Sequence, residues 1–185
     1  MTLTPSVRRF VLAVHVGVSV GWIGAVMAYL PLDVAAATSQ DPQTLRAAYL
    51  AMDLIAWRAV VPLAFASFLT GLVIALGTKW GLFRHYWVLI SLLLTIVAVV
   101  VLVAETRVIG HFADVAADPT TSDDALRALG NTLPHSVGGA VVLVVVMALN
   151  IYKPRGLTPY GWRKQRAAAQ ESTAQTRDPR RIQDP

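Results

Sequence analysis

The sequence contains no cysteine, and this absence excludes disulfides, thiolate catalysis, iron–sulfur clusters and cysteine-based zinc sites. Any metal or cofactor would have to be held by histidine, methionine, carboxylate or backbone groups. Phosphate-binding loops and nucleophile–base motifs are absent as well, so the sequence predicts no catalytic residue and leaves open whether the protein is an enzyme. The histidine and acid spacing of a metal centre is also missing, and no metal site is predicted.

Charged residues are scarce. They make up 15% of the 185 residues, whereas 55% are hydrophobic, and the mean hydropathy is +0.55. An average soluble domain has about 25% charged residues, so most of this chain is expected to lie in the lipid bilayer. The net charge of +5 does not indicate a nucleic-acid partner, because the basic residues are not interleaved with stacking aromatics.

Long apolar segments are the main feature of the sequence. A helix needs about 20 apolar residues to cross the hydrocarbon, because its backbone polar groups must be satisfied within the segment. The segments that meet or approach this length are residues 10–31, 58–78, 86–106 and 134–152. Their length favours an uncleaved first helix over a signal peptide. The sequence predicts an all-α fold, a polytopic membrane protein in which residues 1–152 form a bundle of four transmembrane helices.

Basic residues divide unequally between the two sides of the predicted bundle. One side carries twelve of the sixteen lysines and arginines, eight of them in the tail of residues 153–185. The other side carries the remaining four basic residues and eight acidic ones. Because lysine and arginine are enriched in cytoplasmic segments, the N-terminus, the C-terminus and the loop of residues 79–85 are predicted to be cytoplasmic.

Capping signals and one proline mark the segments between the spans. An Asp-Pro pair at residues 41–42 predicts an amphipathic helix that runs into the second span, where Pro62 is expected to disturb it. Thr121 or Ser122 is expected to cap a short helix. The tail, residues 153–185, is basic and poor in large apolar residues, so it is predicted to be largely disordered. Its charges either favour anionic lipid or only fix the topology.

The first predicted span contains an ionisable residue and two glycines on different faces. His15 lies inside the span, where an ionisable side chain costs several kcal/mol unless it finds a partner. His15 is therefore either a functional residue or a neutral histidine that donates to a neighbouring helix, for example to the hydroxyl of Ser91 or Thr95. Gly17 and Gly21 form a GxxxG pair, which predicts close packing against another helix.

Two histidines lie at the same predicted end of the third and fourth spans. A haem held between helices needs axial ligands at similar depth, and His111 and His135 fit this rule. Two interfacial histidines that reach water are the alternative interpretation. On the same side, Arg58 and Glu105 are expected to form an ion pair between the second and third spans.

Two short segments resemble known families. Residues 15–24, with the sequence HVGVSVGWIG, and residues 80–87, with the sequence WGLFRHYW, resemble a family of small four-helix bacterial integral membrane proteins of unknown function. The first segment is also similar to HemJ-type protoporphyrinogen oxidases and to CopD-type membrane domains. These resemblances imply a location in the bacterial plasma (inner) membrane. In the HemJ type a first-helix histidine is implicated in haem b binding, and His15 would take that role.

Two functions remain open after this comparison. The first is the binding of haem b or a related porphyrin within the bundle, with His15 as the best ligand and His111 and His135 as weaker candidates. The second is a non-enzymatic structural or assembly subunit, whose partners would be the lipid bilayer, a second copy of the chain or a membrane complex. A transporter or channel is disfavoured, because four mostly apolar helices provide few polar groups to line a pore.

Overall fold

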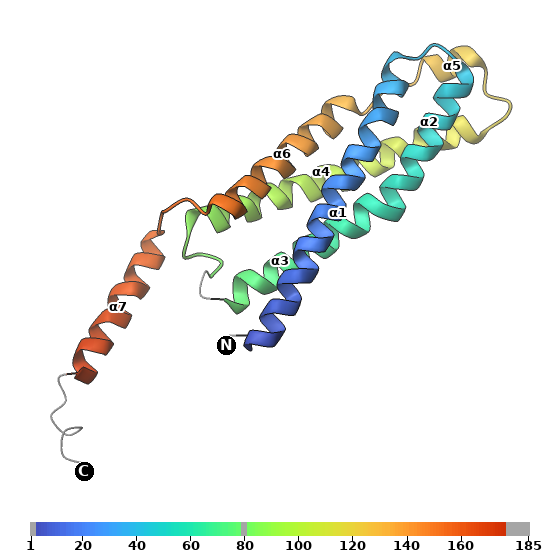
Figure 1. The fold of residues 1–185 in the computed structure, drawn as a ribbon. Helices are drawn as coiled ribbons and strands as arrows, with labels where there is room; N and C mark the ends of the chain where they lie inside the picture. The colour runs from blue at the N-terminus through green and yellow to red at the C-terminus, as the bar shows by residue number, and fades with distance from the viewer. Residues whose placement is uncertain (1–2, 79–80, 177–185) are drawn as a thin grey trace.

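Helices make up the secondary structure of the described residues. The computed structural model describes residues 3–78 and 81–176, with side chains up to residue 170, and no strand is present in this part of the chain (Figure 1). Predictions for Lys79 and Trp80, and for the tail from residue 177 onward, lie outside the described residues. The elements are α1 Pro5–Thr38, α2 Pro42–Ile55, the π-helical turn η1 Ala56–Val60, α3 Val61–Gly77, α4 Tyr86–Ala117, α5 Asp123–Arg127, α6 Leu133–Tyr152 and α7 Pro159–Thr176.

Among the described residues, four stretches of helix are long and apolar enough to cross a membrane. They are Pro5–Thr38, Pro42–Gly77, Tyr86–Ala117 and Leu133–Tyr152. This confirms the predicted all-α class with four candidate spans, which is the architecture of a multi-pass membrane protein. The first span is longer than predicted, because α1 continues through Pro31 to Thr38. A proline removes one backbone hydrogen bond, and the alanines that follow it favour the helix.

The turn η1 joins α2 to α3 in one nearly continuous helix. The N–H of Val61 donates to the carbonyl of Ala56, five residues earlier. Pro62 follows directly and has no N–H to donate to the carbonyl of Arg58. The disturbance predicted at Pro62 therefore takes the form of a π-helical turn, whose buried residues are Ala56 and Val60.

Local sequence signals define where α2 and α5 begin. The Asp41 carboxylate accepts a hydrogen bond from the Thr44 N–H at 3.0 Å, and Pro42 is the first residue of α2. The hydrogen bonds from Thr44 lower the pKa of Asp41. The Ser122 hydroxyl accepts a hydrogen bond from the Ala125 N–H at 3.2 Å. Both predicted caps are confirmed.

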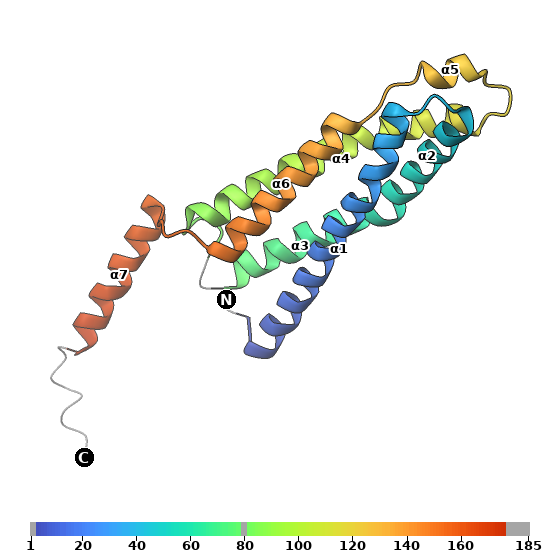
Figure 2. The same ribbon diagram turned by 45° about the horizontal axis from the view of Figure 1, so that its top comes forward.

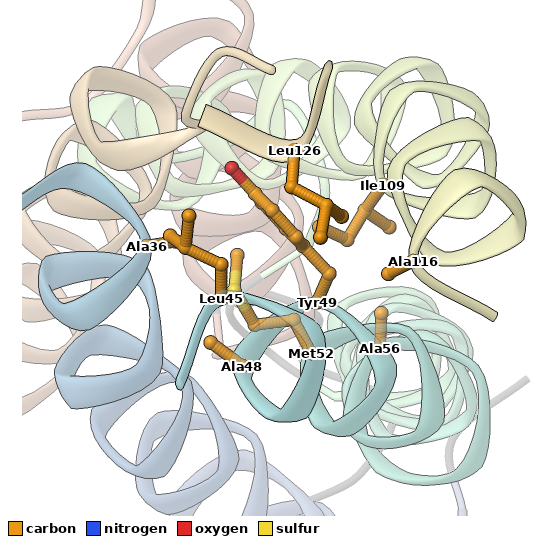
Figure 3. Close-up of a cluster of buried hydrophobic side chains, with 9 residues drawn as sticks. All are labelled: Ala36, Leu45, Ala48, Tyr49, Met52, Ala56, Ile109, Ala116 and Leu126. Carbon is orange, nitrogen blue, oxygen red and sulfur yellow. The ribbon is translucent and has the colours of Figure 1, made fainter. Parts of the chain in front are cut away.

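A cluster of buried side chains lies where α1, α2, α4 and α5 meet (Figure 3). Leu45, Tyr49 and Met52, on one face of the amphipathic α2, are at most 2% exposed. The Tyr49 hydroxyl donates to the carbonyl of Gly130 at 3.0 Å, and its ring meets that of Phe112 edge-on, with the centroids 5.4 Å apart. One face of the predicted amphipathic helix is thus part of the core. We call this end of the bundle the α5 end.

The tail forms a helix within the segment that was predicted to be largely disordered. From the opposite end of the bundle, which we call the α7 end, α7 projects outward (Figures 1 and 2). The Thr158 N–H donates to the carbonyl of Arg84 at 3.0 Å, and the Thr158 hydroxyl accepts from the Gly161 N–H at 3.1 Å. A threonine cap, a first-turn proline and a run of alanines favour a helix despite the polar composition.

Candidate ligand-binding cavity

A cavity of about 290 Å³ lies inside the bundle between α1, η1, α4 and α6. Most of its wall is apolar, and the residues that form this part include Trp22, Val26, Val60, Val97, Leu102 and Leu143. Gly138 and Gly139 of α6 also line the cavity, and neither has a protein atom within 4 Å of the position that a Cβ would occupy. Two consecutive glycines therefore leave the space open.

One end of the cavity is polar. The residues there are Tyr29, Glu105, Thr106, Thr132, His135 and Ser136. Oε1 of Glu105 lies 3.4 Å from Nδ1 of His135, close enough for an ion pair when the imidazole is protonated. The Glu105 side chain is 22% exposed and that of His135 is 57% exposed. This pair thus borders the cavity and also reaches the molecular surface.

The ion pair predicted between Arg58 and Glu105 is replaced by this contact. In the part of the chain that the structure describes, Glu105 makes its ion-pair contact with His135, and Arg58 is exposed. The reason lies in η1, which buries Ala56 and Val60. Arg58 lies between these two residues and is therefore directed away from α4.

Asp33 of α1 is fully buried beside the polar end of the cavity. Its carboxylate accepts hydrogen bonds from the Thr132 N–H at 3.1 Å, the Thr132 hydroxyl at 2.9 Å and the Ser136 hydroxyl at 2.6 Å. Since the Thr132 hydroxyl gives its hydrogen to Asp33, the Tyr29 hydroxyl at 3.1 Å must donate to Thr132. The carboxylate also lies at the positive end of the α6 dipole.

This buried network was missed in the sequence, where Asp33 counted only as one of the acidic residues beyond the first span. The predicted first span ends at Pro31, and Asp33 would then lie in a loop. A usable signal was present, because Tyr29 and Asp33 are four residues apart and share one helix face if α1 continues. Their partners Thr132 and Ser136 have the same spacing at the start of α6.

His15 lies elsewhere, between α1 and α3. Its Nδ1 is 3.0 Å from the hydroxyl of Thr70, and that hydroxyl donates to the carbonyl of Ala66 at 2.6 Å. His15 is therefore the donor to Thr70. The suggested partners on α4 are wrong, although a hydroxyl of a neighbouring helix is indeed the acceptor. His15 precedes Trp22 by seven residues, which is about 10 Å along the helix, and it is not among the residues that line the cavity.

The Gly17 and Gly21 pair packs less closely than GxxxG predicts. Gly17 is exposed, with no atom within 4 Å of an added Cβ. Gly21 faces the side chain of Leu63, whose Cδ2 lies 3.4 Å from that position. The closer approach in this interface is at Gly71, where an added Cβ would lie 3.0 Å from Cε1 of His15.

The candidate haem ligands His111 and His135 differ in their surroundings. His111 is exposed and lies next to Phe112, with the ring centroids 6.3 Å apart, whereas His135 lines the cavity. His111 follows Glu105 by six residues, so it is about 120° around α4 from the residue that His135 contacts. Of these three histidines, His135 is the one that lines the cavity.

Known proteins provide no further constraint on this site. Comparisons with protein-family models, curated proteins and solved structures find no match. The family resemblances therefore stay predictions, and the function has to be inferred from the cavity.

Proposed function

We propose that this protein is a multi-pass protein of the bacterial plasma membrane that binds an amphiphilic molecule in the bundle cavity. The observation that carries the proposal is an apolar cavity with one polar end, because ligand pockets typically combine apolar walls with a few placed polar groups. The apolar body of the ligand would pack against Trp22, Val60 and Leu143. Its head group would lie beside Glu105 and His135.

The charge around the polar end favours a head group that is cationic or rich in hydrogen-bond donors. Two carboxylates lie at this end, since Glu105 lines the cavity and Asp33 accepts hydrogen bonds from Thr132 and Ser136, which also line it. His135 is the one basic side chain among the residues that line the cavity. Asp33 already accepts three hydrogen bonds, so Glu105 is the acceptor that a ligand would meet. A protonated amine matches this arrangement better than a carboxylate does.

Both termini are proposed to be cytoplasmic, which places the polar end of the cavity toward the external face. The distribution of lysine and arginine supports this orientation. A chain without cysteine allows a direct test, because single cysteines can be labelled without background. In intact cells, an impermeant maleimide should modify Asp123→Cys of α5 and leave Gln170→Cys of α7 unmodified. The reverse pattern would overturn the proposed orientation.

Ligand binding is tested with three probes of equal chain length: dodecylamine, dodecanol and dodecanoate. Binding to the full-length protein in lipid nanodiscs would be measured by equilibrium dialysis. Dodecylamine should bind most tightly. Gly139→Leu fills the cavity and should weaken its binding by roughly tenfold or more, since the site for the ligand is lost.

Gly17→Leu is the matched control, because Gly17 has the same open surroundings and lies outside the cavity lining. It should bind dodecylamine like the unchanged protein. Equal binding by both leucine variants would show that the amine partitions only into lipid, and the proposed function would be wrong.

Haem b is a second candidate ligand, favoured by one specific observation. Histidines that ligate metals commonly have a carboxylate beside their other ring nitrogen, and Nδ1 of His135 lies 3.4 Å from Oε1 of Glu105. His135 would hold the haem iron, and haem would supply redox chemistry when bound. Absorption spectra of oxidised and dithionite-reduced protein test this, with His135→Ala and His15→Ala compared. Loss of the bands in His135→Ala supports haem in the cavity, and loss only in His15→Ala supports the site that the HemJ-type resemblance implies.

If neither haem nor an amphiphile binds, the remaining proposal is an assembly subunit. A second copy of the chain or another membrane protein would then be its partner. Crosslinking in the native membrane would detect that contact.

A further inference from the structure

An open groove of about 540 Å³ lies at the α7 end of the bundle, away from the cavity. It forms where α4 begins and α7 leaves the bundle. Arg163 and Arg166 of α7 provide basic groups, and the other residues that line it are Tyr86, Leu157, Pro159 and Trp162. The groove therefore combines two guanidinium groups with an aromatic and aliphatic surface.

Hydrogen bonds hold the start of α7 against the loop that precedes α4. The Tyr86 N–H donates to the carbonyl of Gly156 at 3.3 Å, and the Thr158 hydroxyl donates to the carbonyl of Phe83. Gly161 lies so close to Arg84 that an added Cβ would collide with the Arg84 carbonyl oxygen. The base of α7 is thus docked on the loop before α4, and the groove is a defined feature of the fold.

The charged residues around the groove are all basic. Residues 81–90 and 150–170 include six basic residues and no aspartate or glutamate. The Nε of Arg163 donates to the carbonyl of Pro159 at 3.3 Å, which orients the guanidinium and uses one of its five donors. An arginine with donors in a planar fork matches the oxygens of a phosphate.

The groove lies at the end of the membrane-spanning helices, where lipid head groups are expected. Tyr86 is the first residue of the apolar helix α4, and Tyr152 is the last residue of α6. Tyr86 and Trp162 are both about half exposed, at 48% and 53%. Tyrosine and tryptophan are enriched at the boundary between hydrocarbon and head groups. A ligand in this groove would therefore have its phosphate beside α7 and its apolar part against α4.

We propose that this groove binds an anionic phospholipid, with its phosphate held by Arg163 and Arg166 and its acyl region packed against Tyr86 and Trp162. The groove shares no lining residue with the bundle cavity, so this site does not depend on the proposed function.

The test uses native mass spectrometry of the full-length protein, extracted in detergent and supplied with equal amounts of phosphatidylglycerol and phosphatidylcholine. The unchanged protein should retain phosphatidylglycerol preferentially. The double variant Arg163→Gln/Arg166→Gln should retain roughly tenfold less of it, because each basic residue near the membrane surface contributes to anionic lipid binding. Both arginines are exposed, and circular dichroism would establish that the variant keeps its helices.

Arg8→Gln/Arg9→Gln is the matched control, since it removes the same charge from exposed residues of α1 that do not line the groove. This control should retain phosphatidylglycerol like the unchanged protein. An equal loss in both double variants would mean that only the net charge matters, and the groove would not be a lipid site. Competition by inorganic phosphate or glycerol 3-phosphate at the lipid concentration would also overturn the proposal, because it would identify a site for free phosphate.

Discussion

At the α5 end of the bundle, Leu45, Tyr49 and Met52 are at most 2% exposed, whereas at the α7 end no residue from 5 to 21 of α1 is buried. The same contrast holds for α3, in which no residue from 68 to 77 is buried. Protein side chains fill the space between helices at the α5 end. At the α7 end, these parts of α1 and α3 present their side chains to the surroundings, which in a membrane are lipid, whereas Trp87 and Val88 of α4 are buried.

The two ends therefore depend on different interactions. The α5 end combines dense apolar packing with the buried network around Asp33. The α7 end has isolated polar contacts between α1 and α3, such as Ser19 with Ser67, whose hydroxyls are 2.7 Å apart. The cavity lies between two clusters of buried side chains, because Ile109 belongs to the cluster at the α5 end and Trp22 belongs to a second cluster with Val60 and Leu143.

The largest expected difference between the ends comes from truncating one leucine in each. Leu45→Ala should lower the free energy of unfolding by about 3 kcal/mol, because it leaves a cavity in a tightly packed cluster. Leu76→Ala, at a residue that is 62% exposed, should cost less than about 0.5 kcal/mol. Unfolding by sodium dodecyl sulfate in mixed micelles measures both values. Equal losses would contradict the contrast between the two ends.

The buried carboxylate gives the next largest effect. Asp33→Ala leaves the Thr132 N–H and the Thr132 and Ser136 hydroxyls without their acceptor, and it should cost about 2 kcal/mol. Ser136→Ala removes one of these three bonds and should cost about 1 kcal/mol. The same micelle titration measures both variants. If Asp33→Ala were no more destabilising than Ser136→Ala, the network would not hold α6 against α1.

At the α7 end, the contact of His15 with Thr70 should contribute about 1 kcal/mol to stability. Thr70→Val removes the acceptor with little change of shape and should lower the unfolding free energy by that amount. Thr95→Val is the matched control, because the Thr95 hydroxyl donates within its own helix to the carbonyl of Ser91 at 2.7 Å. A larger loss of unfolding free energy in Thr95→Val than in Thr70→Val would support Thr95 as the partner of His15, as the sequence suggested. Dodecylamine binding should be unchanged in both variants.

The features that the sequence predicted correctly depend on residues close together in the chain. The four apolar stretches, the cap at Asp41 and the cap at Ser122 are each determined within a few residues. The disturbance at Pro62 is local as well, since it follows from one missing N–H. Such signals can be read without knowing which helices are neighbours.

The features that were missed depend on residues far apart in the chain. Thr70 and His15 are 55 positions apart, and Asp33 and Thr132 are 99 positions apart. Glu105 pairs with His135 because η1 directs Arg58 away from α4. A π-helical turn changes the face of the helix on which each following residue lies. The cavity itself requires the packing of four elements, so no segment of the sequence predicts it alone.

The smallest expected effect concerns the exposed cap of α2 and its dependence on pH. Hydrogen bonds from Thr44 lower the pKa of Asp41 in the folded protein. A carboxyl with a lowered folded pKa contributes stability that is fully present above its unfolded pKa, about 3.9, and is lost as the pH falls through the folded value. The melting temperature of Asp41→Ala should therefore lie below that of the unchanged protein by a constant amount from pH 7 to pH 5. The difference should shrink below about pH 4.

Thr44→Ala separates the two hydrogen bonds that cause this shift. The variant loses the hydroxyl bond to Asp41 at 2.7 Å and keeps the backbone N–H bond at 3.0 Å. Its melting temperature should therefore lie between those of Asp41→Ala and the unchanged protein at pH 7, and the gap should close over the same acidic range. A difference that stayed constant down to pH 3 would show that Asp41 acts through its shape and not through its charge. The start of α2 would then depend on Pro42 and on the buried face that Leu45 begins.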